Sequence, residues 1–288
     1  MFHLIVNPIA GKKKKSLARL LDVERVFKEN QIDYAVHQTR TKGDGEEIVK
    51  RLTGEGETDM IVVGGDGTLH EVLNGLADPS VCRLGLIPSG TGNDFAYSAN
   101  IPLNAEEAAK IIVKGETKET DYIEVDGRRS MNVCGLGMDV DVLERCSRGR
   151  MKGKLKYVKS LVSSLFAFKG YKVKVENEER SEEHDSLIAC VCNGKAFGGG
   201  IKICPVAEID DGKLDVMLVD CIGGKLKLIK AFLTLMKGKI MSYPLVTHFL
   251  ADKITFVPKA PTTIQLDGEL YKNLRFEAKS YKGLKVFR

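Results

Sequence analysis

The sequence predicts an α/β N-terminal domain with a mostly parallel sheet flanked by helices, followed by a β-rich, antiparallel, sandwich-like second domain. In the first 115 residues, short apolar runs alternate regularly with amphipathic helical patterns, which is typical of a parallel sheet packed between helices. After Asp121 the pattern changes to short segments in which apolar and polar residues alternate, as in antiparallel strands with one solvated face. We therefore expect two domains, 1–121 and 122–288.

The first domain is expected to contain four strands, each leading through a polar loop into a helix. The first strand, 2–6, is an apolar run that ends at an Asn-Pro pair, a common turn signal. The helix that follows, 17–29, places its leucines and valines mainly on one face. The same reasoning predicts strands 34–37, 60–63 and 84–88, and helices 45–53, 68–77 and 104–114.

The second domain is expected to contain mostly strands, including 122–125, 173–175, 187–191 and 214–218, with helices near 152–168 and 225–238. Both helices carry lysines opposite an apolar face. Such a helix either packs on a sheet at the protein surface or rests on an anionic bilayer. The pattern of 225–238 leaves both alternatives open.

Composition limits the class of protein. The net charge of +5 comes from 44 basic and 39 acidic residues, without the polybasic tail of nucleic-acid binders, so we expect no nucleic-acid partner. The seven cysteines form no Cys-x-x-Cys pair, and we interpret them as reduced thiols of a cytoplasmic protein. The sequence contains no apolar run of membrane-spanning length and no signal-peptide pattern, so any contact with the inner face of the cell membrane is expected to be peripheral.

A glycine-rich turn between strand 60–63 and the next helix is the most specific feature. Glycines allow backbone N–H groups to approach phosphate oxygens, and the start of the helix adds its positive end. The spacing matches neither a P-loop nor a dinucleotide-binding fingerprint. A tight strand-to-helix turn without a ligand is the alternative. The segment consists of Gly64, Gly65, Asp66, Gly67, Thr68 and Leu69.

Asp66 would repel a phosphate unless a cation stood between them, and the natural cation is the Mg²⁺ of Mg-ATP. Three other polar loops also follow predicted strands, and in an open parallel sheet such loops converge on one crevice. We therefore predict an ATP site at this edge of the sheet. The additional residues are Asn7, Pro8, Ile9, Ala10 and Gly11 after the first strand, Thr39 after the second, and Thr91, Asn93 and Asp94 after the fourth.

The motifs at 7–11, 64–68 and 88–95 resemble the diacylglycerol kinase catalytic-domain family, which includes sphingosine and ceramide kinases, and the chain looks similar to the soluble bacterial lipid kinases. The resemblance implies a first domain that holds Mg-ATP, a second domain that takes a diacylglycerol-like lipid, and transfer of the γ-phosphoryl group to the lipid hydroxyl. It also extends the nucleotide contacts to His70 and Glu71. His70 departs from the asparagine that is common at this position in relatives.

The Asp-Gly-Glu segment at 267–269 resembles the family's catalytic motif. A carboxylate within hydrogen-bonding reach of an alcohol suits general-base catalysis, so the resemblance implies Glu269 as the base. Asp267 would join Asp66 and Asp121 in an acidic cluster that holds a metal ion or water. The alternative from the residues alone is a hairpin turn with Glu269 merely exposed.

A second Mg²⁺ is implied near 208–213, where bacterial relatives bind one through an aspartate and flanking carbonyl groups. The corresponding residues are Asp211, with the carbonyls of Glu208 and Lys213. An ordinary Asp-Asp-Gly turn is the alternative.

Two other functions remain open. NAD kinases share the Gly-Gly-Asp-Gly-Thr loop, so a soluble acceptor is conceivable, and a non-catalytic nucleotide- or lipid-binding protein would also keep these loops. An exposed edge strand in the second domain could pair between the subunits of a homodimer.

Overall fold

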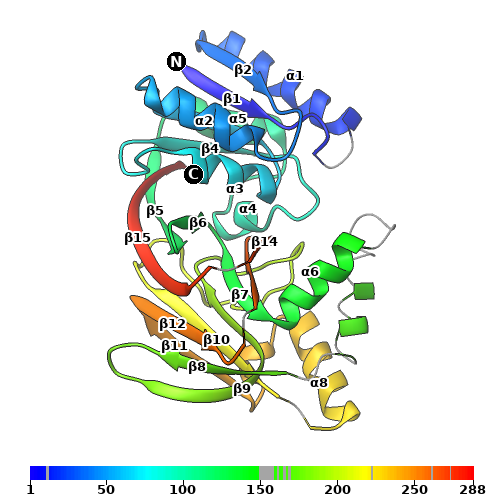
Figure 1. The fold of residues 1–288 in the computed structure, drawn as a ribbon. Helices are drawn as coiled ribbons and strands as arrows, with labels where there is room; N and C mark the ends of the chain where they lie inside the picture. The colour runs from blue at the N-terminus through cyan, green and yellow to red at the C-terminus, as the bar shows by residue number, and fades with distance from the viewer. Residues whose placement is uncertain are drawn as a thin grey trace. The chain divides into compact units, whose positions relative to one another are not determined.

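The computed structural model describes residues 1–288 except 11–12, 149–158, 161, 165–166, 168–169, 222, 261 and 273. The chain forms two compact units (Figure 1): Met1–Asp121 with Lys282–Arg288, and Tyr122–Tyr281. Strands β5 (Thr117–Val125) and β15 (Phe276–Phe287) run from one unit into the other. The end of β15 pairs with β4 of the first unit through Lys285 and Val286. The predicted division assigned the last seven residues to the second domain, whereas in the structure they belong to the first unit.

The first unit is built on a parallel sheet with the strand order β2–β1–β3–β4, followed by the C-terminal part of β15. Strand β3 is buried along its whole length, as expected of a central strand covered on both faces. The bounds are Phe2–Val6 for β1, Tyr34–Gln38 for β2, Asp59–Gly64 for β3 and Arg83–Pro88 for β4.

The helices of the first unit pack in pairs, α1 with α5 and α2 with α3. The chain moves in one direction along the sheet from β1 to β2 and in the other from β2 to β3 and β4. Right-handed crossovers therefore place α1 on the face opposite to α2 and α3. The helices are α1 (Lys13–Glu29), α2 (Asp44–Gly54), α3 (Asp66–Gly75), α4 (Asp94–Ser98) and α5 (Ala105–Lys114). All predicted elements of this unit are present, and the sequence prediction missed the short α4 and the strand at the end of the chain that pairs with β4.

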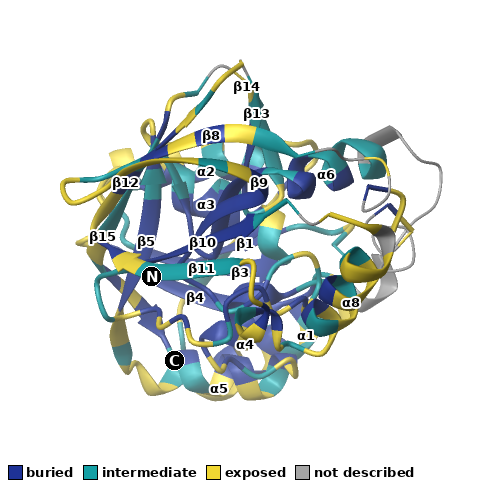
Figure 2. Cartoon of the chain, turned by 90° about the horizontal axis from the view of Figure 1, so that it is seen from below, coloured by how far each residue is buried: buried dark blue, intermediate teal, exposed yellow. Residues whose placement is uncertain are grey.

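The second unit is a β-sandwich whose strands pair antiparallel. Strand β9 is central: it pairs with β10 on one edge and with β7 and β8 on the other. Figure 2 shows β9 and β10 as largely buried. The strands are β6 (Arg128–Ser130), β7 (Val133–Gly137), β8 (Tyr171–Glu176), β9 (Ser181–Cys192), β10 (Leu214–Asp220), β11 (Val246–Ala251), β12 (Lys253–Pro258), β13 (Thr263–Leu266) and β14 (Glu269–Lys272).

Two apolar cores hold this unit together. One lies between strands, where side chains such as Phe256, Phe276 and Leu266 interdigitate. The other lies between strands and helices α6 (Met138–Arg148) and α8 (Lys225–Met236), close to the 3-10 turn Ile240–Ser242. Helix α6 was not predicted, and most of the helix predicted near 152–168 lies outside the described residues.

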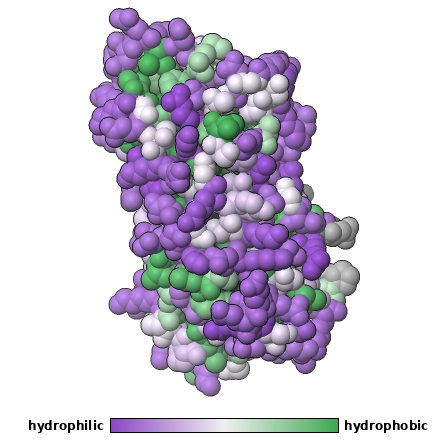
Figure 3. Space-filling model, turned by 90° about the vertical axis from the view of Figure 1, so that its left-hand side faces the viewer, coloured by the Kyte–Doolittle hydropathy of each residue, from purple (hydrophilic) through white to green (hydrophobic). Residues whose placement is uncertain are grey.

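Hydrophilic side chains dominate the face of the molecule seen in Figure 3, with hydrophobic ones in small scattered groups. Among the described helices, none has the length and apolar character needed to cross a membrane.

Candidate functional site

The four predicted loops lie together at the carboxyl edge of the parallel sheet. Backbone hydrogen bonds connect each loop to the neighbouring strand: Asn7 N–H donates to Val63 at 3.1 Å, and Thr39 N–H donates to Val6 at 2.9 Å. Ser89 N–H donates to the carbonyl of Gly64 at 2.7 Å. The edge of the sheet where α/β proteins bind ligands is therefore lined by the residues that the sequence singled out.

The two glycine-rich loops of this edge are in direct backbone contact. A Cβ atom added to Gly65 would lie 2.8 Å from the Cα of Gly90, and one added to Gly90 would lie 2.6 Å from the Cα of Gly65. A Cβ on Gly64 would meet the Thr68 side chain at 2.6 Å. Only glycine fits at Gly65 and Gly90, because a side chain at either would push the two loops apart, and a side chain at Gly64 would displace Thr68.

The carboxylate of Asp66 joins the same two loops. Its Oδ2 accepts a hydrogen bond from Asn93 N–H at 2.7 Å, and its Oδ1 accepts from Asp94 N–H at 2.8 Å and Phe95 N–H at 3.4 Å. These amides lie at the start of α4, and an acidic residue is favourable there. The negative charge of Asp66 is thus compensated by donors within the protein, and its predicted contact with a cation stays a prediction.

The start of α3 is a second source of donors. Leu69 N–H is bonded to the carbonyl of Gly65 at 3.0 Å, and the amides that precede it in the first turn have no acceptor within the helix. Gly65, as N-cap residue, offers no side chain to cap them, and Gly67 is exposed. Asn7 Nδ2 donates to Thr68 Oγ1 at 3.2 Å and ties the first loop to this turn. Exposed helix-start amides beside two glycine-rich loops make a suitable phosphate cradle.

Three residues that were predicted to contact the nucleotide lie in the core or are bonded to another loop. Leu69 and His70 are both 2% exposed and belong to the core around α3. The carboxylate of Glu71 accepts hydrogen bonds from Gly43 N–H at 2.8 Å and Gly45 N–H at 3.0 Å, at the start of α2. Glu71 therefore anchors the loop after Thr39. Direct contacts of these three side chains with a nucleotide stay predictions.

The remaining nucleotide-site candidates lie nearer the surface. Ile9 and Thr91 are exposed, while Pro8 and Ala10 are half-buried. Asn7 Oδ1 accepts from Ile9 N–H at 3.1 Å and shapes this turn. Gly11 lies outside the described residues.

In the second unit, residues 267–269 form the tip of the β13–β14 hairpin. Asp267 and Gly268 have φ values of 50° and 88°, the left-handed conformations of a type I′ turn. The hairpin interpretation is thus correct, and it does not compete with a role for Glu269, which begins β14 and is half-buried.

The Asp267 carboxylate resembles Asp66 in its bonding. It accepts hydrogen bonds from three consecutive amides, those of Met131, Asn132 and Val133, at 2.7, 2.9 and 3.1 Å. Asp267 therefore fixes the hairpin tip against the start of β7. The predicted acidic cluster combines Asp267 with Asp66 and the buried Asp121 of the first unit, and it stays a prediction.

Sequence reasoning missed two residues behind the hairpin, Asp139 and Gln265. Gln265 Nε2 donates to Asp139 Oδ2 at 3.2 Å, and Gln265 Oε1 accepts from Gly268 N–H at 2.9 Å. Burial raises the pKa of the Asp139 carboxyl to about 6. This chain of hydrogen bonds holds Gly268, the residue before Glu269, in place. An amide inside the apolar run of β13 was a signal for Gln265, whereas nothing near Asp139 in the sequence pointed to it.

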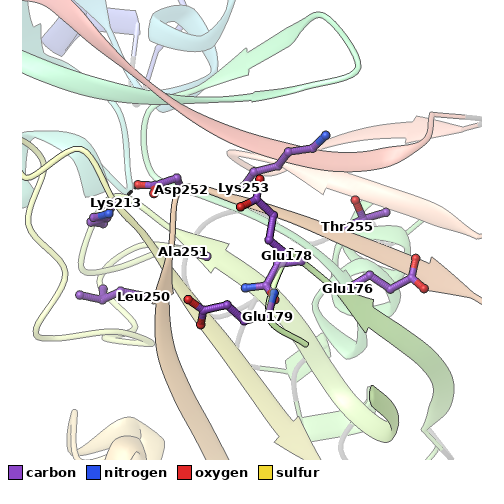
Figure 4. A pocket seen from close by; sticks show the side chains of 10 residues that line it. Glu176, Glu178, Glu179, Lys213, Leu250, Ala251, Asp252, Lys253 and Thr255 are labelled. Carbon is purple, nitrogen blue, oxygen red and sulfur yellow. Dashed lines mark hydrogen bonds and ion pairs between the residues drawn. The ribbon is translucent and has the colours of Figure 1, made fainter. Parts of the chain in front are cut away.

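The acidic loop at 208–213 forms a compact turn in which Asp211 Oδ1 accepts from Lys213 N–H at 2.8 Å. Lys213 Nζ also contacts Asp252 Oδ1 at 2.7 Å across a groove shown in Figure 4. The groove has both acidic and basic residues on its walls, among them Glu176, Glu178, Glu179 and Lys253. The proposed Mg²⁺ at Asp211, with the carbonyls of Glu208 and Lys213, stays a prediction.

Comparisons with known proteins identify relatives over nearly the whole chain. The model for the diacylglycerol kinase catalytic domain matches residues 1–125, and that for the YegS C-terminal NAD kinase beta sandwich-like domain matches residues 132–283. A protein of Xanthomonas euvesicatoria pv. vesicatoria named "Probable lipid kinase YegS-like" is 30% identical over 249 residues, 83% of this chain and 81% of that protein. The "Diacylglycerol kinase" of Bacillus subtilis is 27% identical over 276 residues, 93% of this chain and 89% of the relative.

A solved structure agrees with these matches. The crystal structure of a diacylglycerol kinase from Bacillus anthracis superposes with a TM-score of 0.78 at 26% identity, over 99% of this chain and 96% of that one. The predicted fold class is therefore confirmed.

Proposed function

The chain belongs to the lipid kinase family that contains diacylglycerol kinases and YegS-like proteins, and we propose that it transfers the γ-phosphoryl group of ATP to the hydroxyl group of diacylglycerol, yielding phosphatidate. The observation that carries the proposal is the backbone contact between Gly65 and Gly90, held by Asp66 beside the start of α3. This arrangement presents main-chain donors to phosphates at the edge of the sheet.

The ATP phosphates bind to the amides around Gly65, Gly67 and Thr68. Asn7 and Thr39 border the same edge from the neighbouring loops. Mg²⁺, bound with ATP, supplies charge neutralisation of the phosphates. The rigid backbone contacts keep the cradle in place before the nucleotide arrives, which reduces the entropy lost on binding.

Glu269 acts as the general base that takes the proton from the lipid hydroxyl. The hairpin that carries it is fixed on both sides, by Asp267 against residues 131–133 and by Gln265 against Gly268. A base held in this way loses little conformational entropy when the acceptor binds.

The acyl chains of the acceptor occupy apolar space beneath α8. A cavity of about 30 Å³ there is lined only by apolar residues, among them Met138, Ile203, Phe232 and Leu235. The cavity is smaller than an acyl chain, so the proposal requires that α8 moves outward when the lipid binds.

Helix α8 also forms the membrane contact. Leu228, Ala231, Phe232 and Leu235 pack on the core. A second apolar stripe faces outward and is flanked by exposed lysines at 227, 230 and 237. This combination suits the surface of an anionic bilayer. The stripe consists of Leu226, Ile229, Leu233 and Met236, with exposures of 83, 38, 51 and 46%.

Sedimentation with vesicles containing anionic lipid tests this contact. Leu233→Glu is expected to lower the bound fraction, while Leu103→Glu, at an equally exposed leucine of the first unit, leaves it unchanged. Equal binding of the two variants would assign the contact to another surface.

Two finer proposals accompany this function. A homodimer would form through an edge strand of the second unit, for which β14 is a candidate because it ends the strand order in the described part of the chain; light scattering tests it. The Mg²⁺ at Asp211 is tested by metal analysis of Asp211→Ala. We place the protein in the cytoplasm, at the inner face of the membrane.

The experiment that tests the main proposal is incubation of the protein with labelled ATP, Mg²⁺ and a panel of acceptors in mixed micelles. The panel contains diacylglycerol, ceramide, sphingosine and NAD. We expect label in phosphatidate and none in NADP. Labelling of NAD alone would instead identify an NAD kinase, and ATP binding without transfer to any acceptor would favour a non-catalytic protein.

A further inference from the structure

Three residues with different donor atoms converge in the second unit. Cys204 lies in the segment between β9 and β10, Asp215 on β10 and His248 on β11. One sulfur, one carboxylate oxygen and one imidazole nitrogen from these residues lie within 4.8 Å of one another. Residues up to 44 positions apart in the sequence thus meet at one point.

Strand pairing explains the convergence. In the antiparallel β10–β11 ladder, Met217 is opposite His248 and Asp215 is opposite Leu250. Asp215 and His248 are therefore diagonal neighbours on one face of the sheet, because side chains alternate with period two. Cys204 reaches the same face from the loop, which is held by a hydrogen bond from Cys204 N–H to the carbonyl of Lys195 at 3.3 Å.

The three side chains meet at a largely buried place. Cys204 is fully buried, and the Asp215 side chain is 3% exposed. Asp215 Oδ1 lies 2.6 Å from His248 Nε2. A carboxylate in such a place must be hydrogen-bonded, and the imidazole of His248 is the group within reach of it. The thiol of Cys204 is a weak hydrogen-bonding group, and its side chain is hydrogen-bonded with that of Cys192.

The donor set distinguishes between metal ions. Mg²⁺ and Ca²⁺ prefer oxygen ligands only, and a site with sulfur and nitrogen does not suit them. Thiolate, imidazole and carboxylate together are typical ligands of Zn²⁺. The His248 side chain is 26% exposed, so an ion and a water ligand can reach the group from solvent.

We propose that Cys204, Asp215 and His248 bind a thiophilic divalent metal ion, Zn²⁺, which ties β10, β11 and the preceding loop together. Binding releases the thiol proton of Cys204 to solvent and replaces the Asp215–His248 hydrogen bond. With metal–ligand bonds of about 2.0 Å, the nitrogen and oxygen atoms move apart to about 3.3 Å, a small adjustment of two side chains. This site is separate from the proposed Mg²⁺ at Asp211 and does not depend on the kinase reaction.

Titration of the metal-stripped protein with Co²⁺ tests the proposal, because Co²⁺ bound to thiolate absorbs in the near ultraviolet. We expect thiolate-to-cobalt charge-transfer absorption that saturates at one equivalent and is displaced by Zn²⁺. His248→Ala changes the most exposed ligand and is expected to weaken Co²⁺ affinity at least about 100-fold. Cys190→Ser is the matched control, since this buried thiol lies 3.9 Å from Cys192 but outside the three ligands.

Thermal unfolding provides a second readout. Addition of Zn²⁺ is expected to raise the Tm of the wild type and of Cys190→Ser, but not that of His248→Ala or Cys204→Ser. The proposal is overturned if charge-transfer absorption is missing in the wild type, or if it persists in Cys204→Ser. If His248→Ala has a lower Tm than the wild type by the same amount with and without Zn²⁺, the metal adds no stability. In that case His248 stabilises the protein only through its contact with Asp215.

Discussion

Replacing Asp66 by asparagine separates a structural role for this residue from direct contact with a metal. The carboxylate accepts two short hydrogen bonds, from Asn93 N–H at 2.7 Å and Asp94 N–H at 2.8 Å. Asparagine keeps one acceptor oxygen but turns an NH₂ group toward the other amide. Hydrogen bonds to charged groups contribute about 1.5–3 kcal/mol each, so we expect the free energy of unfolding to fall by roughly 2 kcal/mol. If the loop must be ordered before ATP binds, the same 2 kcal/mol weakens ATP affinity roughly 30-fold.

Two measurements check this prediction. Denaturant unfolding gives the change in stability, and isothermal titration gives ATP affinity at a low and a high Mg²⁺ concentration. The control is Asp78→Asn, because Asp78 also accepts a backbone hydrogen bond, from Ser80 N–H at 2.9 Å, but in an exposed turn. If Asp66 orders the loop, the loss of affinity is the same at both Mg²⁺ concentrations. Unchanged stability, with affinity restored by excess Mg²⁺ or Mn²⁺, would refute the reasoning.

Three further predictions concern the glycine contact, the buried acid and the lipid pocket. Gly65→Ala places a Cβ 2.8 Å from the backbone of Gly90 and is expected to abolish ATP binding in a filter or titration assay. Gly54→Ala, whose Cβ would meet nothing within 4 Å, is expected to bind ATP normally. Equal ATP binding by the two variants would show that the loops can separate freely. Because the pKa of Asp139 rises from 3.8 to about 6 on folding, its stabilising contribution is present below pH 3.8 and is lost as the pH rises through about 6. Between pH 5 and 7 the wild type should therefore lose about 1.3 kcal/mol relative to Asp139→Asn, measured by denaturant unfolding, and a difference that does not vary with pH would contradict this. Ala231→Val narrows the cavity under α8 and is expected to raise the KM for diacylglycerol several-fold with the KM for ATP unchanged. A raised KM for ATP alone would place the acyl chains elsewhere.

Much of the first unit could be predicted because its signals are local. Continuous apolar runs such as β3 identify buried strands, and the glycine-rich turn after β3 identifies the loop. Parallel strands then require that the loops share one edge of the sheet. The contact between Gly65 and Gly90 could not be predicted in this way, since it depends on the register of two strands.

The role of Asp66 shows why the rest was missed. In the sequence an acidic residue in a phosphate-binding loop suggests a cation, and the amides that compensate it lie 27 to 29 residues further along the chain. Asp139 and Gln265 are 126 residues apart, so no local pattern connects them. The orientation of α8 could not be predicted either, because the helix has apolar residues on two sides and periodicity does not tell which side the core covers.

The most direct test of the account is the single-turnover rate of phosphoryl transfer to diacylglycerol in Glu269→Gln, at saturating ATP and Mg²⁺. General-base catalysis contributes about 10²–10⁴-fold, and we expect a loss of that size with ATP affinity unchanged. Glu183→Gln, at an exposed glutamate of β9 paired with Lys259, serves as the control and should match the wild type. A transfer rate for Glu269→Gln within a few-fold of the wild type would contradict the assignment of Glu269 as the base.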